Sequence, residues 1–449
     1  MKRLIYNKLK QWKESQEHKP LILLGARQVG KTYILKEFGT REFHNLVYVN
    51  CYKNSFAQTL FRDMSVTRII TEIEHYQETK IVPGQTLLVF DEIQEVPNGI
   101  ASLKYFCEDM LDLHVAVAGS LLGISLREGE SYPVGKVTTM RMYPMTFTEF
   151  LMACGREQLV ELLESLDWDG ITALHEMLTD YLRQYFFVGG MPEAVSKYVA
   201  SRAIEEVRAV QSEIIDAYER DIAKHTSTFA IRIYQVWQGI VPQLARENKK
   251  FIYGALRKGG RAADYEKAIQ WLADAGLVYK VERVSEPTLP LKFYANGTAF
   301  KLFMTDCGLT ACMAEANANA MLLGNNAFVE FNGAFTENFF LQQLRAVTDA
   351  PAYYYSKENS TLEIDFLYQG NERVVPVEVK AETNVRSKSL SQFVMHEFAA
   401  SEMKALRVSL LPYKDQGWME NVPLYAEIER RGEILAYLEF IRSYFPGCH

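Results

Sequence analysis

Short apolar runs occur at intervals along the first third of the chain. They predict buried strands over 21–24, 46–50, 86–90 and 115–118, because a few apolar residues in a row are typical of strands covered on both faces. More polar stretches with helical spacing lie between these runs, as the crossover between parallel strands requires. The pattern therefore predicts an α/β fold that begins with a parallel sheet packed against helices.

The pattern becomes helical in the middle of the chain. Residues 151–207 have helical spacing and predict a helical lid, and a further helix is predicted over 208–224. A helical pair that ends in the helix 262–275 leads to strands at 277–281 and 292–294, with a proline-containing turn between them. This succession of helix, turn, helix, strand, wing and strand predicts a winged helix.

Strands return near the C-terminal end. The spacing predicts an amphipathic helix over 328–346, strands over 353–355, 362–367 and 374–380, and a helix over 387–399. This order predicts a second α/β domain.

Composition narrows the class of protein. The chain is 48% hydrophobic and 23% charged, as globular proteins are, and its net charge of −7 argues against bulk attraction to nucleic acid or membranes while leaving room for a local basic face. The six cysteines lack paired C-x-x-C spacing, so no zinc site is predicted. No apolar run approaches the ~20 residues of a membrane helix. We also find no export signal at the N-terminus. We predict a cytoplasmic protein without a membrane partner.

A phosphate-loop pattern follows the first apolar run. It consists of Gly25, Ala26, Arg27, Gln28, Val29, Gly30, Lys31 and Thr32. The two glycines let the backbone turn tightly, and the N–H groups of the loop then surround anionic oxygens at a helix N-terminus. Lys31 is expected to reach the β- and γ-phosphates, and the Thr32 hydroxyl to bind Mg²⁺. The sequence therefore predicts a nucleotide site.

Two acidic residues follow directly after the apolar run at 86–90. Asp91 is expected to hold Mg²⁺ through water, and Glu92 to act as general base toward the attacking water, which predicts ATP hydrolysis. Ser120 follows the next strand and is a candidate for orienting that water or contacting the γ-phosphate. An ordinary Gly-Ser turn is the alternative explanation for Ser120.

Several segments together resemble one group of AAA+ proteins, the prokaryotic ATPases that carry a C-terminal domain of unknown function. They are Gly-Ala-Arg-Gln-Val-Gly-Lys-Thr, Val-Phe-Asp-Glu-Ile-Gln, Ala-Gly-Ser and Met-Tyr-Pro-Met-Thr-Phe-Thr-Glu-Phe. The resemblance covers essentially the whole chain and implies an ATPase. One position departs from it, because the family often has Gly-Arg where this chain has Gly135-Lys136. If that arginine is a phosphate sensor or finger, Lys136 or Arg141 must replace it.

Two further positions carry alternatives. The segment 187–193 contains a Gly-x-Pro that resembles the lid motif of STAND-like P-loop ATPases, in which a proline packs near the nucleotide base, and this makes Pro192 a candidate nucleotide contact. A helix that starts at Pro192 explains the same residues. Arg220 is a candidate trans-acting finger in a homo-oligomer, and an ion pair with Glu219 or Asp216 is the alternative.

Basic residues gather before the helix 262–275. They are Arg246, Lys249, Lys250, Arg257, Lys258 and Arg261. Such a patch suits DNA phosphates, which makes DNA a candidate partner. The helix itself offers Asp264, Glu266 and Asp274, which suit a DNA groove poorly. A winged helix that serves as a packing or hinge module is therefore the alternative.

The C-terminal pattern resembles the PD-(D/E)XK nuclease core. Glu378 and Lys380 lie two apart on one predicted strand and so share a face, and Asp365 lies on the preceding strand. Asp365 and Glu378 are candidate Mg²⁺ ligands, Lys380 would position water, and Glu337 would complete the site from a helix. A cross-strand ion pair, or a nuclease-like fold that only binds, explains the same residues.

The patterns divide the chain into an AAA+ P-loop ATPase domain (1–150), a helical lid (151–207), a winged-helix-containing domain (208–313) and a nuclease-like domain (325–449). We expect ATP and Mg²⁺ as cofactors, and ATP hydrolysis coupled through the lid and the winged helix to the C-terminal domain. An ATP-gated DNA-processing nuclease or defence effector is one alternative. A nucleotide switch that binds partners or DNA without cleavage is another.

Overall fold

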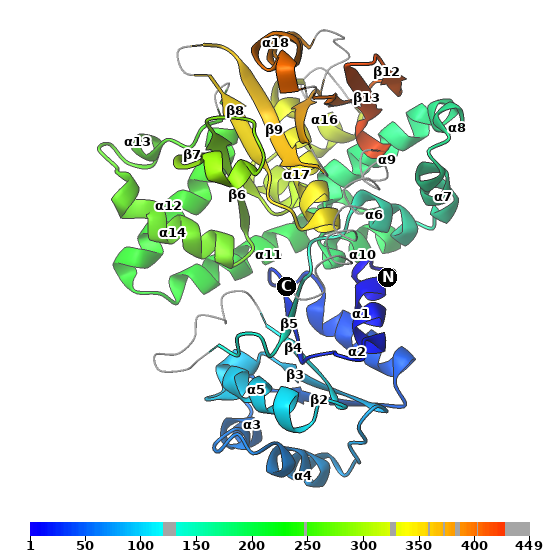
Figure 1. Ribbon diagram of the computed structural model, residues 1–449, viewed down its shortest axis with the longest axis vertical. Coiled ribbons are helices and arrows are strands. Elements are labelled where there is room, and N and C mark those ends of the chain that lie inside the picture. The colour runs from blue at the N-terminus through cyan, green and yellow to red at the C-terminus, as the bar shows by residue number, and fades with distance from the viewer. Residues whose placement is uncertain are drawn as a thin grey trace. The chain divides into compact units, whose positions relative to one another are not determined.

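The architecture comes from a computed structural model (Figure 1). It describes residues 1–119, 132–246, 249–323, 329–357, 360–370, 373–381, 387–401 and 403–426. Two compact units result, which we call the N-terminal unit (Lys2–Tyr143 with Asp274–Gly276) and the C-terminal unit (Pro144–Ala273 and the chain from Leu277). Within the described ranges, no helix is both long and apolar enough to cross a membrane.

The N-terminal unit contains a five-stranded sheet. Its strands are β1 (Leu21–Leu24), β2 (Asn45–Asn50), β3 (Thr86–Asp91), β4 (His114–Ala118) and β5 (Thr138–Arg141), in the order β2-β3-β4-β1-β5. All neighbours pair in parallel. The predicted parallel sheet is thus confirmed, and β5 is an edge strand that the apolar pattern did not reveal.

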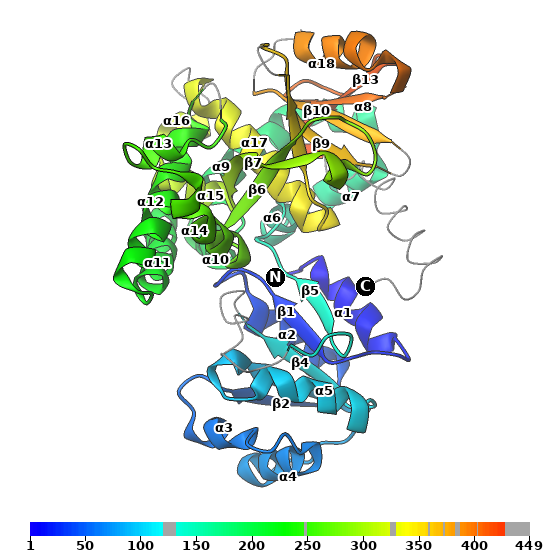
Figure 2. The same ribbon diagram turned by 60° about the vertical axis from the view of Figure 1, so that its left-hand side comes forward.

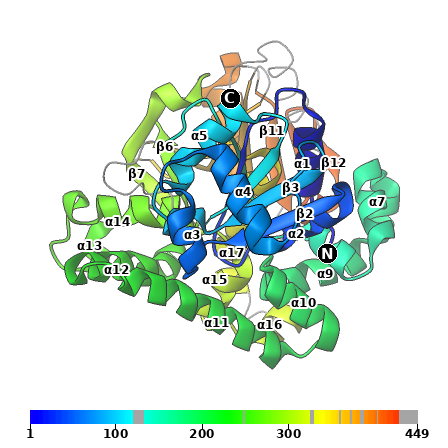
Figure 3. The same ribbon diagram turned by 90° about the horizontal axis from the view of Figure 1, so that it is seen from below.

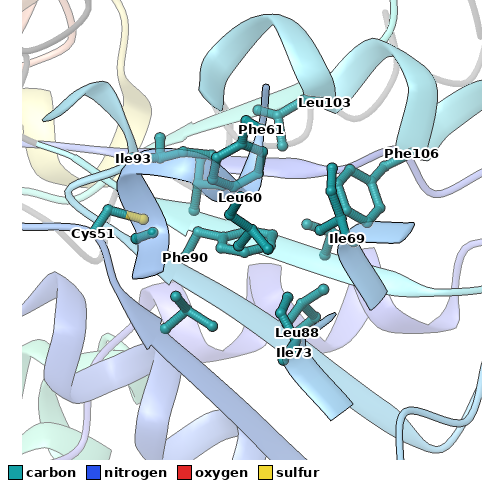
Figure 4. Close-up of a cluster of buried hydrophobic side chains, with 14 of the residues drawn as sticks. Cys51, Leu60, Phe61, Ile69, Ile73, Leu88, Phe90, Ile93, Leu103 and Phe106 are labelled. Atoms are coloured by element: carbon teal, nitrogen blue, oxygen red, sulfur yellow. The ribbon is translucent and has the colours of Figure 1, made fainter. Parts of the chain in front are cut away.

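Helices cover the sheet of the N-terminal unit. They are α1 (Ile5–Glu14), α2 (Lys31–Glu42), α3 (Ser55–Leu60), α4 (Val66–Gln77) and α5 (Gly99–Asp109). The polar stretch 57–78 does not form one continuous helix, because the chain turns at Met64 with a φ of +56° and divides the stretch into α3 and α4, which lie side by side in Figure 3. Figure 4 shows the core beneath them, where Phe61 and Phe106 flank Phe90.

The C-terminal unit begins with helices, as predicted for 151–207. The first six are α6 (Phe147–Ala153), α7 (Glu157–Ser165), α8 (Trp168–Ala173), α9 (His175–Val188), α10 (Pro192–Ser201) and α11 (Ile204–Ala223). The next are α12 (Ser227–Leu244), α13 (Tyr253–Leu256) and α14 (Ala262–Asp274), which lie together with α11 at one side of the unit (Figure 2). The last are α15 (Cys307–Met313), α16 (Ala318–Leu323), α17 (Val329–Thr348) and α18 (Lys388–Gln392).

An eight-stranded sheet forms the centre of the C-terminal unit. Its strands are β6 (Val278–Val284), β7 (Ala295–Met304), β8 (Tyr353–Ser356), β9 (Glu363–Gln369), β10 (Val374–Val379), β11 (Ala405–Ser409), β12 (Lys414–Asp415) and β13 (Met419–Pro423). The order is β12-β13-β11-β10-β9-β8-β6-β7, and β6 pairs in parallel with β8. Strands from the region predicted as a winged helix and strands from the region predicted as nuclease-like therefore belong to one sheet.

One predicted strand of the wing is wrong. Residues 292–294 lie in a 3₁₀ turn (Leu291–Tyr294), because the N–H of Phe293 bonds back to the carbonyl oxygen of Pro290 at 3.0 Å. The strand begins just afterwards, as β7.

A buried polar network connects α9 and α10 to the rest of the C-terminal unit. Asp306, which is fully buried, accepts hydrogen bonds from the N–H groups of Gly190 (2.6 Å) and Leu309 (2.9 Å). The Gln342 amide donates to Asp306 at 3.1 Å and to the Tyr185 hydroxyl at 2.9 Å. These bonds connect the ends of α9 and α10 with α15 and α17.

Candidate functional site

The backbone of the phosphate loop requires its glycines. Gly25 has a φ of +154°, and a Cβ there would lie 2.2 Å from the Met142 carbonyl oxygen. Gly30 (φ +98°) stands before the first residue of α2, and Gln28 (φ +67°) lies between the two glycines. The loop thus turns tightly between β1 and α2, which is how anion-binding loops are built. Of the other predicted loop residues, Ala26 and Val29 are buried and Arg27 is exposed.

Lys31 is buried against this loop. Its Nζ donates to the carbonyl oxygens of Gly25 and Ala26 at 2.9 and 2.8 Å, and 8% of the residue is exposed. Burial lowers the pKa of Lys31 to about 8, although the carboxylates of Glu92 and Asp91 act in the opposite direction. The ammonium group is therefore held by acceptors whose place phosphate oxygens can take.

Thr32 and Asp91 meet at the carboxyl end of β3. The Thr32 hydroxyl donates to Asp91 Oδ2 at 2.9 Å, and the Tyr48 hydroxyl donates to the same oxygen at 2.7 Å. A hydroxyl and a carboxylate are the hard oxygen ligands that Mg²⁺ prefers, so these residues fit that ion. Tyr48 was not predicted as part of the site. The sequence could have indicated Tyr48 only through its position in β2, the strand next to the one that ends in Asp91.

Glu92 lies directly after β3 in the left-handed region (φ +53°), and its N–H donates to the Ala118 carbonyl oxygen at 2.9 Å. Burial raises the pKa of the Glu92 carboxyl, against a lowering hydrogen bond from the amide of Gln94. A raised pKa suits a general base. Gln94 was also missed, although it stands two residues after Glu92. The Ser120 prediction lies outside the described residues.

The replacements considered for the family arginine lie at opposite ends of β5. Arg141 is exposed and is the register partner of Leu24, so it stands at the edge where the phosphate loop begins. Lys136 precedes β5 and pairs with Glu108 at 2.9 Å. The structure therefore brings Arg141, and not Lys136, close to the loop.

Comparison with known families agrees with this geometry. Residues 17–151 match the family model of an AAA domain. This part of the chain is similar to AAA domains. The match supports the expected AAA+ ATPase class for residues 17–151. Residues 179–320 match a domain of unknown function, DUF8612, and residues 332–424 match another, DUF4143. The nuclease-like character of the C-terminal region stays a prediction.

Solved structures resemble the chain at low identity. The Walker-type ATPase PABY2304 of Pyrococcus abyssi is 13% identical with a TM-score of 0.43, over 69% of this chain and 94% of that one. The Aeropyrum pernix ORC1 protein, solved in complex with DNA, is 13% identical with a TM-score of 0.27, over 72% and 95%. RuvB of Thermotoga maritima is 16% identical with a TM-score of 0.29, over 61% and 87%. Among curated proteins, none matches the chain.

Pro192 and Arg220 belong to the C-terminal unit. Pro192 is the first residue of α10, directly after the Gly190 segment that Asp306 holds. Arg220 lines an open cleft of about 680 Å³ between α11 and α12, together with Asp216 and Glu219. Both roles stay predictions.

The carboxylates of the predicted nuclease-like site share one sheet face. Asp365 faces Glu378 across the antiparallel β9–β10 pair, because Phe366 is the register partner of Val377. One oxygen of Asp365 accepts the Val379 N–H at 2.9 Å. Lys380 pairs with Glu378 at 3.1 Å.

Helix α17 adds Glu337 to this group, and two further lysines accompany it. Lys249 contacts Glu337, while Lys301 pairs with Glu363 at 2.6 Å. Burial alone would raise the pKa of Glu337, but the charges of Lys249 and Lys301 outweigh it and lower that pKa. Burial and the charge of Glu337 raise the pKa of Asp365. We call the four acids Glu337, Glu363, Asp365 and Glu378, together with the lysines 249, 301 and 380, the carboxylate cluster.

Two oxygens in the carboxylate cluster lack hydrogen bonds. They are Oε2 of Glu337 and Oε2 of Glu378, and both residues are more than nine-tenths buried. Buried carboxylate oxygens without donors are the kind of atom that a cation completes. Throughout the described part of the chain, however, no three His, Cys, Asp or Glu side chains are grouped closely enough to hold a metal ion. The cluster therefore contains candidate ligands but no assembled metal centre.

Proposed function

We propose that the chain is an ATPase that binds ATP at the phosphate loop and hydrolyses it with Mg²⁺. The observation that carries the proposal is that the hydroxyls of Thr32 and Tyr48 both donate to one oxygen of Asp91. This group lies beside Lys31 and Glu92. A nucleotide-binding loop alone would need none of the acidic residues at the end of β3. Their presence next to the loop supports hydrolysis rather than binding alone.

Each residue has a role in this proposal. Thr32 and Asp91 hold Mg²⁺, which neutralises charge on the phosphates when it is bound. Lys31 exchanges its carbonyl partners for phosphate oxygens. Glu92, whose pKa is raised by burial, accepts the proton of the attacking water, and Gln94 orients its carboxylate.

Two substitutions test this proposal. Lys31→Ala removes the ammonium group that contacts the phosphates, and Glu92→Gln removes the general base, so each should abolish steady-state ATP turnover. Glu92→Gln should still bind a fluorescent ATP analogue, because it leaves the loop intact. Lys104→Ala, an exposed lysine on α5, is the control with the same change of charge as Lys31→Ala. Full turnover in both site variants would overturn the proposal.

We further propose that hydrolysis is coupled through the lid (151–207) and the winged helix (208–313) to the nuclease-like domain (325–449). The order α12, α13, α14, β6, β7 supports a winged helix, and the polar network around Asp306 supplies a stiff connection from the lid to α17. Limited proteolysis of Glu92→Gln with and without ATP tests the coupling. A cleavage pattern of the C-terminal unit that ATP does not change would contradict it.

DNA is the proposed macromolecular partner. Arg257, Lys258 and Arg261 are exposed before α14 and are able to contact phosphates. Fluorescence anisotropy with labelled duplex DNA, at increasing salt, should show binding that weakens in the triple alanine variant of these residues. Binding of equal strength by that variant would remove this surface from the proposal.

An ATP-gated nuclease is the second candidate, favoured by Asp365 facing Glu378 with Lys380 on the same face. Single- and double-stranded DNA and RNA, incubated with Mg²⁺ or Mn²⁺ with and without ATP, provide the assay. Cleavage that Lys380→Ala abolishes would support a nuclease. If neither the parent chain nor Lys380→Ala shows metal-dependent cleavage, the result would favour a nucleotide switch that binds without cutting.

A further inference from the structure

Lys249 is largely buried, although the sequence pattern groups it with the basic residues that precede the helix 262–275. It lies between α12 and α13, and only 14% of its side chain is exposed. Its ammonium group contacts Glu337 Oε1, on a side chain that is 5% exposed. A Cβ on Gly333 would lie 3.7 Å from the Lys249 Nζ, so the ammonium group lies against α17 one turn before Glu337. Its neighbour Lys250, in contrast, is exposed.

The other lysines of the carboxylate cluster have their own partners. Lys301 comes from β7, pairs with Glu363 at 2.6 Å and lies 4.9 Å from the centre of the Tyr354 ring. Lys380 pairs with Glu378 at 3.1 Å and keeps 38% of its side chain exposed. Lys249 is therefore the cation of the cluster that contacts Glu337, whereas Lys301 and Lys380 act on Glu337 as more distant charges.

Charge balance shows what removal of Lys249 would do. The cluster has four carboxylates, of Glu337, Glu363, Asp365 and Glu378, against three ammonium groups. Without Lys249, none of the described cations would contact the buried Glu337 carboxylate, and only the more distant charges of Lys301 and Lys380 would offset it beside Asp365. Burying such a charge is strongly unfavourable, so the site would then attract a cation.

We infer that Lys249 prevents divalent cations from binding to the acids of the carboxylate cluster. Its ammonium group contacts Glu337, at the position that a metal ion bound by Glu337 would need. This inference rests on the candidate ligands of the proposed nuclease-like domain. While Lys249 is in place, Glu337 is neutralised from within the chain. Withdrawal of Lys249 opens Glu337, and the unpartnered oxygens of Glu337 and Glu378 become available to a hard divalent ion. Lys249 is thus an autoinhibitory contact between the segment after α12 and α17.

Manganese binding to the full chain without nucleotide tests the inference. Bound Mn²⁺ is counted by electron paramagnetic resonance in the parent chain, in Lys249→Met, and in the double variant Lys249→Met with Glu337→Gln. Lys250→Met is the matched control, since it removes the same charge one residue further along. Glu337→Gln alone is measured as well, and any Mn²⁺ at Thr32 and Asp91 is common to all five proteins and cancels in the comparison.

We expect Lys249→Met to bind one more Mn²⁺ per chain than the parent and the Lys250→Met control, and the double variant to lose it. Equal Mn²⁺ binding by Lys249→Met and the parent would overturn the inference. It would also be overturned if the parent chain bound a Mn²⁺ that Glu337→Gln alone removes. This second comparison needs no change at Lys249, so it decides the matter even where Lys249→Met does not fold. ATP turnover of the same samples reports on Lys31 and Glu92 separately, so failure here differs from failure of the ATPase proposal.

Discussion

Two neutral side chains hold the acidic residues of the nucleotide site. Tyr48 donates to Asp91, and Gln94 donates to Glu92, so both carboxylates are oriented before any ligand binds. Hydrogen bonds to a carboxylate favour its charged form. Gln94 therefore opposes the burial that raises the pKa of Glu92, and so favours the ionised form of the base.

Gln94→Leu should shift the pH dependence of ATP turnover. Loss of the amide donor raises the pKa of Glu92 further, because burial and the charge of Asp91 are then opposed only by the charges of Lys31 and Arg27. The base must be deprotonated to work, so the acidic limb of the kcat profile should move to higher pH. Gln58→Leu is the control, since it removes the same amide group from a side chain that donates to the carbonyl oxygen of Glu95 at 3.2 Å rather than to the Glu92 carboxylate. Superimposable profiles for Gln94→Leu and the parent would contradict this role.

His114 makes the stability of the N-terminal unit sensitive to acid. Its ring stacks on His18 with centroids 3.8 Å apart, and burial together with His18 lowers its pKa to about 4. The unfolded chain therefore binds more protons between pH 6.5 and 4, so stability falls as the pH falls through that range. Between pH 7 and 5 we expect a loss of about 2 kcal/mol in the free energy of unfolding.

Urea denaturation at the two pH values measures this effect. His114→Phe should flatten the dependence, because phenylalanine fits the aromatic surroundings of Trp12 and Phe43 and carries no proton. His75→Asn, at an exposed position, should leave the dependence unchanged. An equally steep dependence in His114→Phe would assign the acid sensitivity to other groups.

At the scale of elements, strands that contain an apolar run could be predicted and strand β5 could not. The runs that became β1, β3 and β4 are apolar because every residue of these strands is buried, so the signal is local. Strand β5, with alternating partly buried and exposed residues, leaves no such run. The phosphate-loop glycines and Asp91 were predictable for the same reason of local spacing. Tyr48 was not, because its partner lies on a neighbouring strand.

Strand β5 also places a charge that sequence reasoning could not assign. Arg141→Ala should slow ATP turnover by roughly tenfold, the effect of losing about 1.4 kcal/mol of transition-state stabilisation. The reason is its register position opposite Leu24, next to Gly25. Lys136→Ala should leave kcat unchanged, because Lys136 pairs with Glu108 on the surface. Steady-state kinetics of the two variants decides between them, and a slower Lys136→Ala with an unaffected Arg141→Ala would reverse the assignment.

At the scale of the whole molecule, long-range pairing decides the organisation. The sequence divides the C-terminal half into a lid, a winged helix and a nuclease-like domain, whereas the described chain has one sheet shared by the last two. The pairing of β6 with β8 joins residues about seventy positions apart, for example Glu282 and Tyr353. No local pattern of apolar residues contains that information, which explains why the sheet was not foreseen.

A truncation tests whether the lid and winged-helix regions fold without the nuclease-like part. A fragment covering 144–315 keeps both regions but loses β8 and α17. It would leave the N–H groups of Met304, Cys307 and Phe147 without their side-chain acceptors, which are Asn338, Gln342 and Gln343 at 3.1, 2.9 and 2.8 Å. Each buried N–H without an acceptor costs about 1–3 kcal/mol, and the open edge of β6 favours aggregation.

We therefore expect fragment 144–315 to lack a cooperative thermal transition and to be cut rapidly by protease, whereas fragment 144–449 should unfold cooperatively. Circular dichroism melts and proteolysis time courses of the two fragments make the comparison. Fragment 1–143 is the control for truncation itself, because its parallel sheet takes all of its strands from within that range. Cooperative unfolding of 144–315 would show that the lid and winged-helix regions are autonomous, as the sequence pattern alone predicts. Loss of cooperativity there, with both controls folded, would identify the shared sheet as the structure on which the C-terminal unit depends.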